Sequence, residues 1–309
     1  MEWLLALMLV WGSMTAAANE KAKADAIQAA LELQRAAQQE AREAEAEAGM
    51  YDENAQAILA SSWTLLPKIT YPGDVILVRA IKEGSLKWQN KTYALQPFGK
   101  GFYTFLPISM NIKPGSYPIG SETLTVLNKT FETQRIKVTK AQEAMTSNVE
   151  RIQKDQIKID KARSVSDPRF LFKEPFIQPV MGRLSTPYGF TRYVNGKFSG
   201  SHKAIDLANP EGTPVKATNA GKVVLAEELY LTGNSIYIDH GMNLFSQYAH
   251  LSKINVKAGD MVEAGQIIGL VGTTGFSTGP HLHFTFWVGG SPVNPNVFFN
   301  TTPFHWNNK

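Results

Sequence analysis

The C-terminal part of the chain consists of short apolar runs separated by glycine and proline, and this pattern argues against long helices there. The clearest example is residues 256–275, VKAGDMVEAGQIIGLVGTTG, in which glycines recur between short apolar stretches. Glycine in such positions is typical of tight turns in a twisted β architecture. We therefore expect everything after Phe176 to form one small β-rich module.

The same glycine spacing occurs in lipoyl and biotinyl carrier domains, which are an alternative interpretation. A carrier domain presents a modifiable lysine at the tip of a hairpin. No lysine lies between Gly259 and Gly289. The glycines are therefore interpreted as turn residues, and the carrier interpretation is rejected.

Histidines in this module have a spacing that is typical of metal ligands. In an extended strand, side chains at even separations share one face, so His202 and Asp206 of the sequence HKAID are expected to share a face. The same parity places His281 and His283 together and turns Leu282 toward a core. Catalytic zinc takes three protein ligands with N or O donors and leaves its fourth position to water. The residues thus predict a hydrolytic zinc centre.

Four stretches of the module resemble peptidase family M23, the lysostaphin or LytM type of zinc metallopeptidase. The resemblance extends over about residues 175–300 and is carried by SHKAIDLANPEGTPVKA, GNSIYIDHGMNLFSQYAHLS, VKAGDMVEAGQIIGLVGTTG and STGPHLHF. It implies that His202, Asp206 and His283 bind Zn²⁺. It also implies catalytic roles for His250 and His281, without assigning the proton acceptor or the group that stabilises the oxyanion.

Some positions depart from the family pattern and concern substrate recognition. Ala204 stands where the family usually has glycine, and it is small enough to sit beside a metal. Phe276 stands where many members have arginine, and Thr285 where glutamate often follows HLHF. Arg192, in TPYGFTRY, resembles the segment at the mouth of the family's groove. Arg192 and Phe276 are therefore candidate substrate contacts, with a surface salt bridge as the alternative for Arg192.

The two remaining histidines are interpreted as structural residues. His240 lies in the turn-like sequence DHGM between apolar runs, where capping a turn is favoured over binding zinc. His305 lies beside Phe304 and Trp306 and is interpreted as a packing or surface residue.

The chain begins with an apolar run, WLLALMLVWGSM, followed by small residues. This pattern predicts a signal peptide over residues 1–18 and export to the periplasm or cell envelope. An uncleaved N-terminal anchor remains open because Met1 and Glu2 precede the run without a basic residue. The chain has no cysteine, so neither disulfides nor a lipid on an N-terminal cysteine can contribute.

Composition predicts a mainly β protein with three further segments ahead of the M23 peptidase domain at residues 175–309. Residues 19–62 are rich in Ala, Glu, Gln and Lys and predict a helical segment. Residues 63–140 contain short runs such as VILVRAI, FYTFLPI and TQRIKV between turns, and predict a small immunoglobulin-like β-sandwich. Residues 141–174 return to helical spacing and predict a helical linker.

The predicted function is that of an exported zinc metalloendopeptidase acting on peptide cross-links of bacterial peptidoglycan. The net charge of +4 favours encounter with a polyanionic envelope, and no basic tract indicates nucleic acid. Envelope proteins are further candidate partners, through the N-terminal helix or the β domain. One alternative is a LytM-type non-enzymatic activator of a cell-wall amidase, and retention of all five residues argues against it. A purely structural zinc site would need a fourth ligand, and none is evident.

Overall fold

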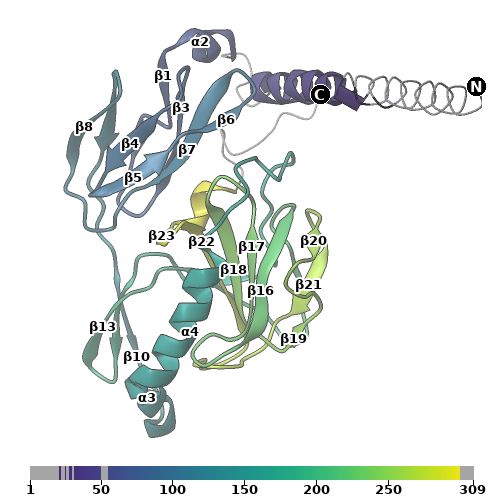
Figure 1. Ribbon diagram of the computed structural model, residues 1–309. Coiled ribbons are helices and arrows are strands. Elements are labelled where there is room, and N and C mark those ends of the chain that lie inside the picture. The colour runs from purple at the N-terminus through teal and green to yellow at the C-terminus, as the bar shows by residue number, and fades with distance from the viewer. Residues whose placement is uncertain (1–20, 22–24, 26–27, 30, 50–54, 300–309) are drawn as a thin grey trace, which may run out of the picture. The chain divides into compact units, whose positions relative to one another are not determined.

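The computed structural model describes residues 21, 25, 28–29, 31–49 and 55–299 (Figure 1). The chain divides into two compact units, residues 1–45 and 46–309. The described residues of the first unit are helical, as the sequence predicts, and its apolar side chains are exposed, with Leu33 at 73%. None of the helices in the described part is long and apolar enough to cross a membrane. The expected signal peptide lies outside the described residues.

The second unit begins with the end of the helix and a short helix, α2 (Ala55–Ala60), followed by a β domain. One sheet of this domain is antiparallel throughout and contains, in order, β1 (Trp63–Leu66), β3 (Val75–Ala80), β7 (Gly101–Pro107) and β6 (Gln96–Phe98). A second sheet contains β2 (Ile69–Thr70), β9 (Glu122–Val126) and β8 (Gly115–Ile119), and a hairpin is formed by β4 (Ser85–Trp88) and β5 (Lys91–Ala94). Residues 63–126 therefore form mainly β structure.

Strand β3 is buried on both faces, which explains its unbroken apolar sequence VILV. Ile76 and Val78 pack into the core of the β domain, whereas Val75 and Leu77 belong to a second core that continues into the C-terminal domain. Asn294 reinforces this contact, because its side chain donates to Asp74 Oδ1 at 3.0 Å.

The C-terminal domain is built on one large antiparallel sheet (Figure 1). Its strands are, in order, β11 (Arg183–Thr186), β14 (Ile205–Ala208), β22 (His281–Val288), β18 (Leu244–Leu251), β17 (Gly233–Asp239), β16 (Gly221–Leu229) and β20 (Met261–Val262), with β23 (Ser291–Val293) beside β22. A smaller sheet contains β15 (Pro214–Lys216), β21 (Ile267–Leu270) and β19 (Lys253–Ile254), and η2 (Pro295–Val297) follows. The mainly β fold class is confirmed.

The segment between the two β domains forms β10 (Thr133–Ile136), α3 (Lys140–Ser147) and α4 (Val149–Ala162). The sequence TQRIKV was expected as a strand of the β-sandwich, and it does form a strand. Its partner, however, is β12 (Thr191–Val194) of the C-terminal domain, which in turn pairs with β13 (Lys197–Ser201). Helices α3 and α4 occupy the first part of the expected helical linker, and residues 163–174 are not helical.

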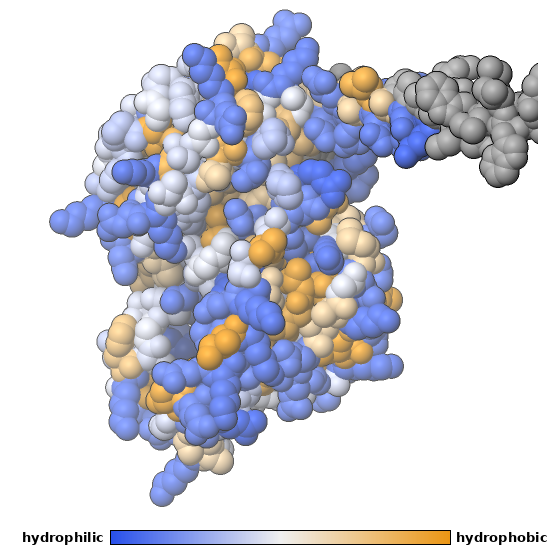
Figure 2. Space-filling view, in the orientation of Figure 1, coloured by the Kyte–Doolittle hydropathy of each residue, from blue (hydrophilic) through white to orange (hydrophobic). Residues whose placement is uncertain are grey.

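On the side seen in Figure 2, polar residues cover most of the surface and apolar residues occur in small groups between them. The molecule therefore relies on its buried cores, in the absence of cysteine, for stability.

Candidate metal centre

Two neighbouring strands carry most of the candidate ligands. Strands β14 and β22 pair antiparallel, and the register places Asp206 directly opposite His283. His281 and His283 lie on the same face of β22, while Leu282 is fully buried in the core on the other face. The predicted parity of the His281–His283 pair is thus confirmed, and a strand pair brings an imidazole and a carboxylate together.

The expectation that His202 and Asp206 share one strand is wrong. His202 lies in the connection between β13 and β14, and the strand begins only at Ile205. The backbone of His202 is held by a neighbouring turn instead: its N–H donates to Phe190 O at 2.8 Å, and its carbonyl accepts from Gly189 N at 2.7 Å. The chain bends at the buried Ala204, and the side chains of His202 and Asp206 still converge.

Three side-chain atoms form a tight ring that is suited to a cation. Asp206 Oδ1 lies 2.8 Å from His283 Nδ1 and 3.1 Å from His202 Nε2, and the two nitrogens are 3.4 Å apart. Ligands bound to zinc at about 2.0–2.2 Å in tetrahedral geometry are about 3.3–3.6 Å from one another. The ring needs only a slight expansion to hold zinc, and two imidazoles with one carboxylate match a known type of catalytic donor set.

Backbone carbonyls fix three of the imidazoles with one nitrogen turned toward the site. The Nδ1 atoms of His202, His250 and His281 lie 3.1, 2.8 and 2.8 Å from the carbonyl oxygens of Pro187, Thr274 and Gly279. Because a carbonyl only accepts, each neutral ring carries its proton on Nδ1 and presents an Nε2 lone pair. Such partners orient metal ligands and proton acceptors alike.

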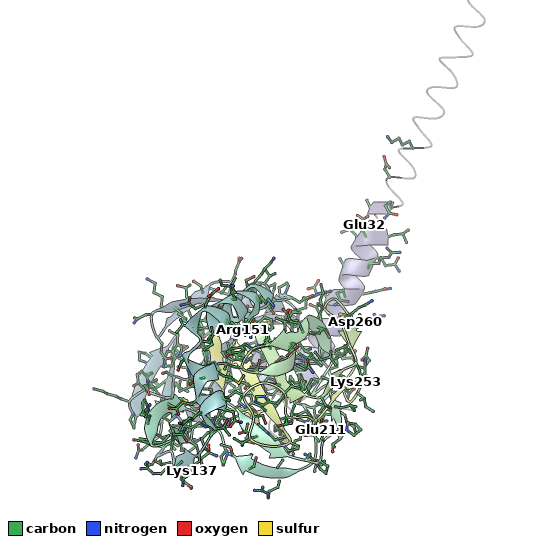
Figure 3. All side chains as sticks on the ribbon, turned by 90° about the horizontal axis from the view of Figure 1, so that it is seen from below. Glu32, Lys137, Arg151, Glu211, Lys253 and Asp260 are labelled. Carbon is green, nitrogen blue, oxygen red and sulfur yellow. The ribbon has the colours of Figure 1, made fainter. Side chains whose placement is uncertain are left out.

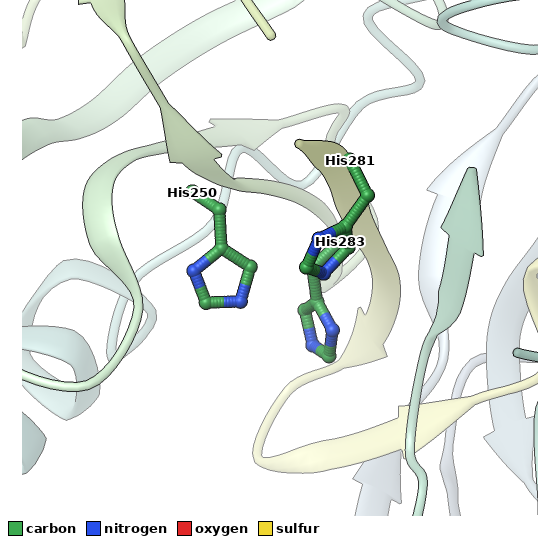
Figure 4. A group of neighbouring side chains, drawn as sticks. All are labelled: His250, His281 and His283. Carbon is green, nitrogen blue, oxygen red and sulfur yellow. The ribbon is translucent and has the colours of Figure 1, made fainter. Parts of the chain in front are cut away.

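His250 approaches the centre from strand β18, beside β22 (Figure 4). Its φ of 61° turns the ring out of the regular strand direction. The ring centroid lies 4.9 Å from that of His281 and 5.6 Å from that of His283. Nitrogens of these three histidines also lie within 4.8 Å of one another, so His283 belongs to two possible metal-binding groups.

Burial and charge set the protonation of the centre. Burial alone would raise the pKa of Asp206, but its interactions with His202 and His283 outweigh burial and hold this pKa well below its usual range. Burial lowers the pKa of His283, and it lowers the pKa of His250 to about 3 with help from the neighbouring histidines. An ionised carboxylate among neutral imidazoles is the protonation state that a divalent cation requires.

Arg192 lies behind the carboxylate, where its Nη2 is 3.7 Å from Asp206 Oδ2. Its Nε donates to Gln134 Oε1 at 3.1 Å, so the guanidinium is held between a strand of the linker and the centre. Phe276 is half-buried on the loop before β22 and belongs to neither metal-binding group. Sequence reasoning missed Gln134, and no local signal could have revealed it, because its role depends on the pairing of β10 with β12.

His240 stands apart from the centre. His240 is fully buried, with Nδ1 2.7 Å from Ala220 O and Nε2 2.8 Å from Ser246 Oγ, and it belongs to neither metal-binding group. It is therefore a core residue with satisfied hydrogen bonds. His305 lies outside the described residues.

The chain is similar to peptidases over its C-terminal domain. The family model for peptidase family M23 matches residues 200–295. A segment of 128 residues is 40% identical to the DD-carboxypeptidase/endopeptidase Mpg of Neisseria meningitidis, covering 41% of this chain and 30% of that protein. A segment of 93 residues is 48% identical to the peptidoglycan DD-endopeptidase ShyA of Vibrio cholerae, covering 30% of this chain and 22% of that protein.

A solved structure extends the likeness beyond the catalytic segment. A Pseudomonas aeruginosa protein of the M23 peptidase type is 28% identical, with a TM-score of 0.56, and the match covers 74% of this chain and 94% of that one. The chain spans about a third or less of the length of the curated relatives it matches first.

Proposed function

Because the C-terminal domain belongs to peptidase family M23, we propose that the protein is an exported zinc metallopeptidase that hydrolyses peptide bonds of peptidoglycan. One observation carries the proposal: the ring of Asp206 Oδ1, His202 Nε2 and His283 Nδ1, with spacings of 2.8–3.4 Å. Two further imidazoles, His250 and His281, stand beside this ring without being needed to complete it.

His202, Asp206 and His283 would hold the zinc ion. When bound, zinc lowers the pKa of water toward neutrality and polarises a scissile carbonyl as a Lewis acid. The protein's part is to keep the three donors deprotonated and converging. Asp206 serves this purpose because its low pKa keeps it ionised, and Arg192 neutralises the outer oxygen of the same carboxylate.

His281 is the proposed carrier of the proton from water to the leaving amine. Its Nε2 lies 3.8 Å from Asp206 Oδ1, so an imidazolium formed there is stabilised by a nearby negative charge. Its Nδ1 proton is bound by Gly279 O, which leaves Nε2 as the acceptor. General acid–base catalysis of this kind contributes about 10²–10⁴-fold to a rate.

His250 is the proposed orienting group. Its pKa of about 3 keeps the ring neutral, since burial and two adjacent histidines disfavour a charge there. A neutral ring with its proton on Nδ1 can only accept at Nε2, so it would align the attacking water by accepting a hydrogen bond from it.

Peptidoglycan is the proposed substrate because the relatives named for an activity on it, such as ShyA, match over this domain. The export proposed from the N-terminal sequence agrees with such a substrate. Endopeptidase cleavage of stem-peptide cross-links is the proposed reaction, and the bond itself is left to the products.

The test is release of new amine groups and muropeptides from purified peptidoglycan. The zinc-loaded protein should cleave, whereas a His281→Ala variant and a chelator-treated sample should not. Product masses then identify the bond. Absence of cleavage by a folded protein that binds one zinc would refute the enzymatic proposal and favour a regulator of another hydrolase.

A further inference from the structure

The linker between the two β domains, which here means β10, α3 and α4, packs against the metal-centre region. It lies outside the family-matched segment. Strand β10 extends the edge of β12 in parallel, with Gln134 opposite Arg192. The Gln134 side chain bridges two elements: Oε1 accepts from Arg192 Nε at 3.1 Å, and Nε2 donates to Thr186 Oγ1 at 2.9 Å. The linker is thus fixed at a residue whose guanidinium faces Asp206.

The chain after β10 is anchored to the turn between β12 and β13. The side chain of Asn195 makes two hydrogen bonds to the backbone of Val138. Its Oδ1 accepts from Val138 N at 3.0 Å, and its Nδ2 donates to Val138 O at 3.2 Å. Glu143 of α3 accepts from Asn195 at 3.0 Å and pairs with Lys197 at 3.2 Å. The position of α3 against this hairpin is therefore defined by side-chain bonds as well as by its capping box at Thr139.

The linker also reaches the loop that holds His281. Gln142 Nε2 donates to Ser277 O at 2.8 Å. In that loop Gly279 O binds His281 Nδ1 at 2.8 Å, and Ser277 Oγ lies 3.4 Å from the same nitrogen. A hydrogen bond from the linker is therefore two residues away from the carbonyl that orients the proposed proton carrier.

Between the linker and this loop lies an open cavity of about 700 Å³, lined by residues 137–139 and Gln142 on one side and by Thr273 and residues 277–280 on the other. Its lining contains hydroxyl groups, an amide, a lysine, one valine, glycine and proline, and no aromatic side chain. Such a surface suits the backbone and small side chains of an extended peptide, not a bulky apolar group. Lys137 is exposed at its edge, and no acidic partner for it is found among the described residues.

We propose that residues 133–147 form a second wall of the substrate groove and that this cavity binds an extended peptide whose free carboxylate pairs with Lys137. The inference rests on the proposed function and names a recognition element for the same site. It assigns specificity to a segment that precedes the family-matched residues 200–295. Hydroxyl groups of the lining would bind the peptide backbone, and the ammonium group of Lys137 would select a carboxylate over its amide.

The test compares Lys137→Gln with the wild-type chain on two soluble cross-linked muropeptides, one with a free carboxylate and one amidated. Lys253→Gln is the matched control, because Lys253 is also exposed and lies on the opposite side of the view from Lys137 in Figure 3. We expect Lys137→Gln to raise KM for the carboxylate substrate about 5–10-fold, with kcat retained and the amidated substrate little changed. The control should behave as wild type on both.

Equal effects of Lys137→Gln on the two substrates, or no effect on either, would overturn the proposal. Faster cleavage by the variant would also overturn it, because the segment would then obstruct the groove. If the wild-type chain cleaves neither substrate, the proposed function fails, and the cavity is tested separately by calorimetric binding of the same muropeptides to the His281→Ala protein. Tighter binding of the carboxylate form, lost in a Lys137→Gln/His281→Ala double variant, would then support the subsite, and equal binding of both forms would refute it.

Discussion

At the scale of single residues, Asp206 is the group on which the metal centre depends most. Its Oδ1 contacts His283 Nδ1 and His202 Nε2. No other carboxylate belongs to either of the two metal-binding groups in the described chain. We expect Asp206→Asn to lose bound zinc on dialysis and to lower hydrolysis at least about 100-fold. Metal analysis by atomic emission measures the first effect. Asp260→Asn, on an exposed turn, is the matched control and should keep its zinc.

His240 provides a prediction about pH that is separate from the metal centre. Burial lowers its folded-state pKa from 6.5 to about 4, so the unfolded chain takes up a proton first as the pH falls. The contribution of neutral His240 to the free energy of unfolding is therefore fully present above about pH 6.5. It is lost as the pH falls from about 6.5 to about 4. Between pH 7 and pH 5 we expect His240 to account for a loss of about 2 kcal/mol in the free energy of unfolding.

The measurement is urea unfolding of the wild type and His240→Gln at both pH values. Other buried histidines, such as His250, titrate in the same direction, so the difference between the two proteins isolates His240. The variant should be less stable at pH 7 but less sensitive to acid. Parallel pH dependences in the two proteins would contradict the assignment.

The five residues named from the sequence lie together in the structure, in two groups that share His283. Alternation along a strand predicted that His281 and His283 share a face, and the structure confirms it. The same rule misplaced His202, because its backbone bonds with Phe190 and Gly189 and leaves the sheet. The role of Gln134 could not be predicted from the sequence, because it depends on a contact with Arg192, which is distant in the sequence.

At the scale of elements, the end of the N-terminal helix is fixed to the β domain by a buried ion pair. Glu47 and Arg79 are each about 1% exposed or less, and Arg79 Nε donates to Glu47 Oε1 at 3.0 Å. The Tyr103 hydroxyl donates to the same oxygen at 2.6 Å. Removing one partner of such a pair leaves the other charge buried and uncompensated.

We expect Glu47→Ala to lower the free energy of unfolding by about 3–5 kcal/mol, measured by urea denaturation. Glu45→Ala, at an exposed position of the same helix, should change it by less than about 0.5 kcal/mol. A Glu47→Ala protein as stable as the control would show that the pair contributes nothing to this contact.

Strands were predicted more successfully than their partners. The run TQRIKV forms β10 as expected, yet it pairs with β12, some 58 positions later in the register Thr133 to Thr191. Apolar alternation defines a strand but does not identify the sheet edge that it joins, because pairing depends on loop geometry and on the surrounding core. Helices α3 and α4, by contrast, have local signals, since Thr139 caps α3 and Glu150 lies in the first turn of α4.

At the scale of the whole molecule, composition indicated separate β and peptidase domains but not the core that joins them. Phe105 on β7 is 1% exposed and lies 6.4 Å, ring to ring, from Phe298 of the C-terminal domain. Phe172 and Phe176 belong to the same core. The two β domains therefore share buried apolar surface, which couples their stabilities.

This coupling predicts that residues 46–309 unfold in one cooperative transition. Phe105→Ala removes a side chain from the shared core and should destabilise the protein by about 3–5 kcal/mol. Leu124→Ala alters only the core of the β domain, where Leu124 is fully buried, and is the comparison. Scanning calorimetry should show one peak that moves to lower temperature in both variants. If Leu124→Ala instead split the peak and left the peptidase transition unmoved, the two domains would be energetically independent.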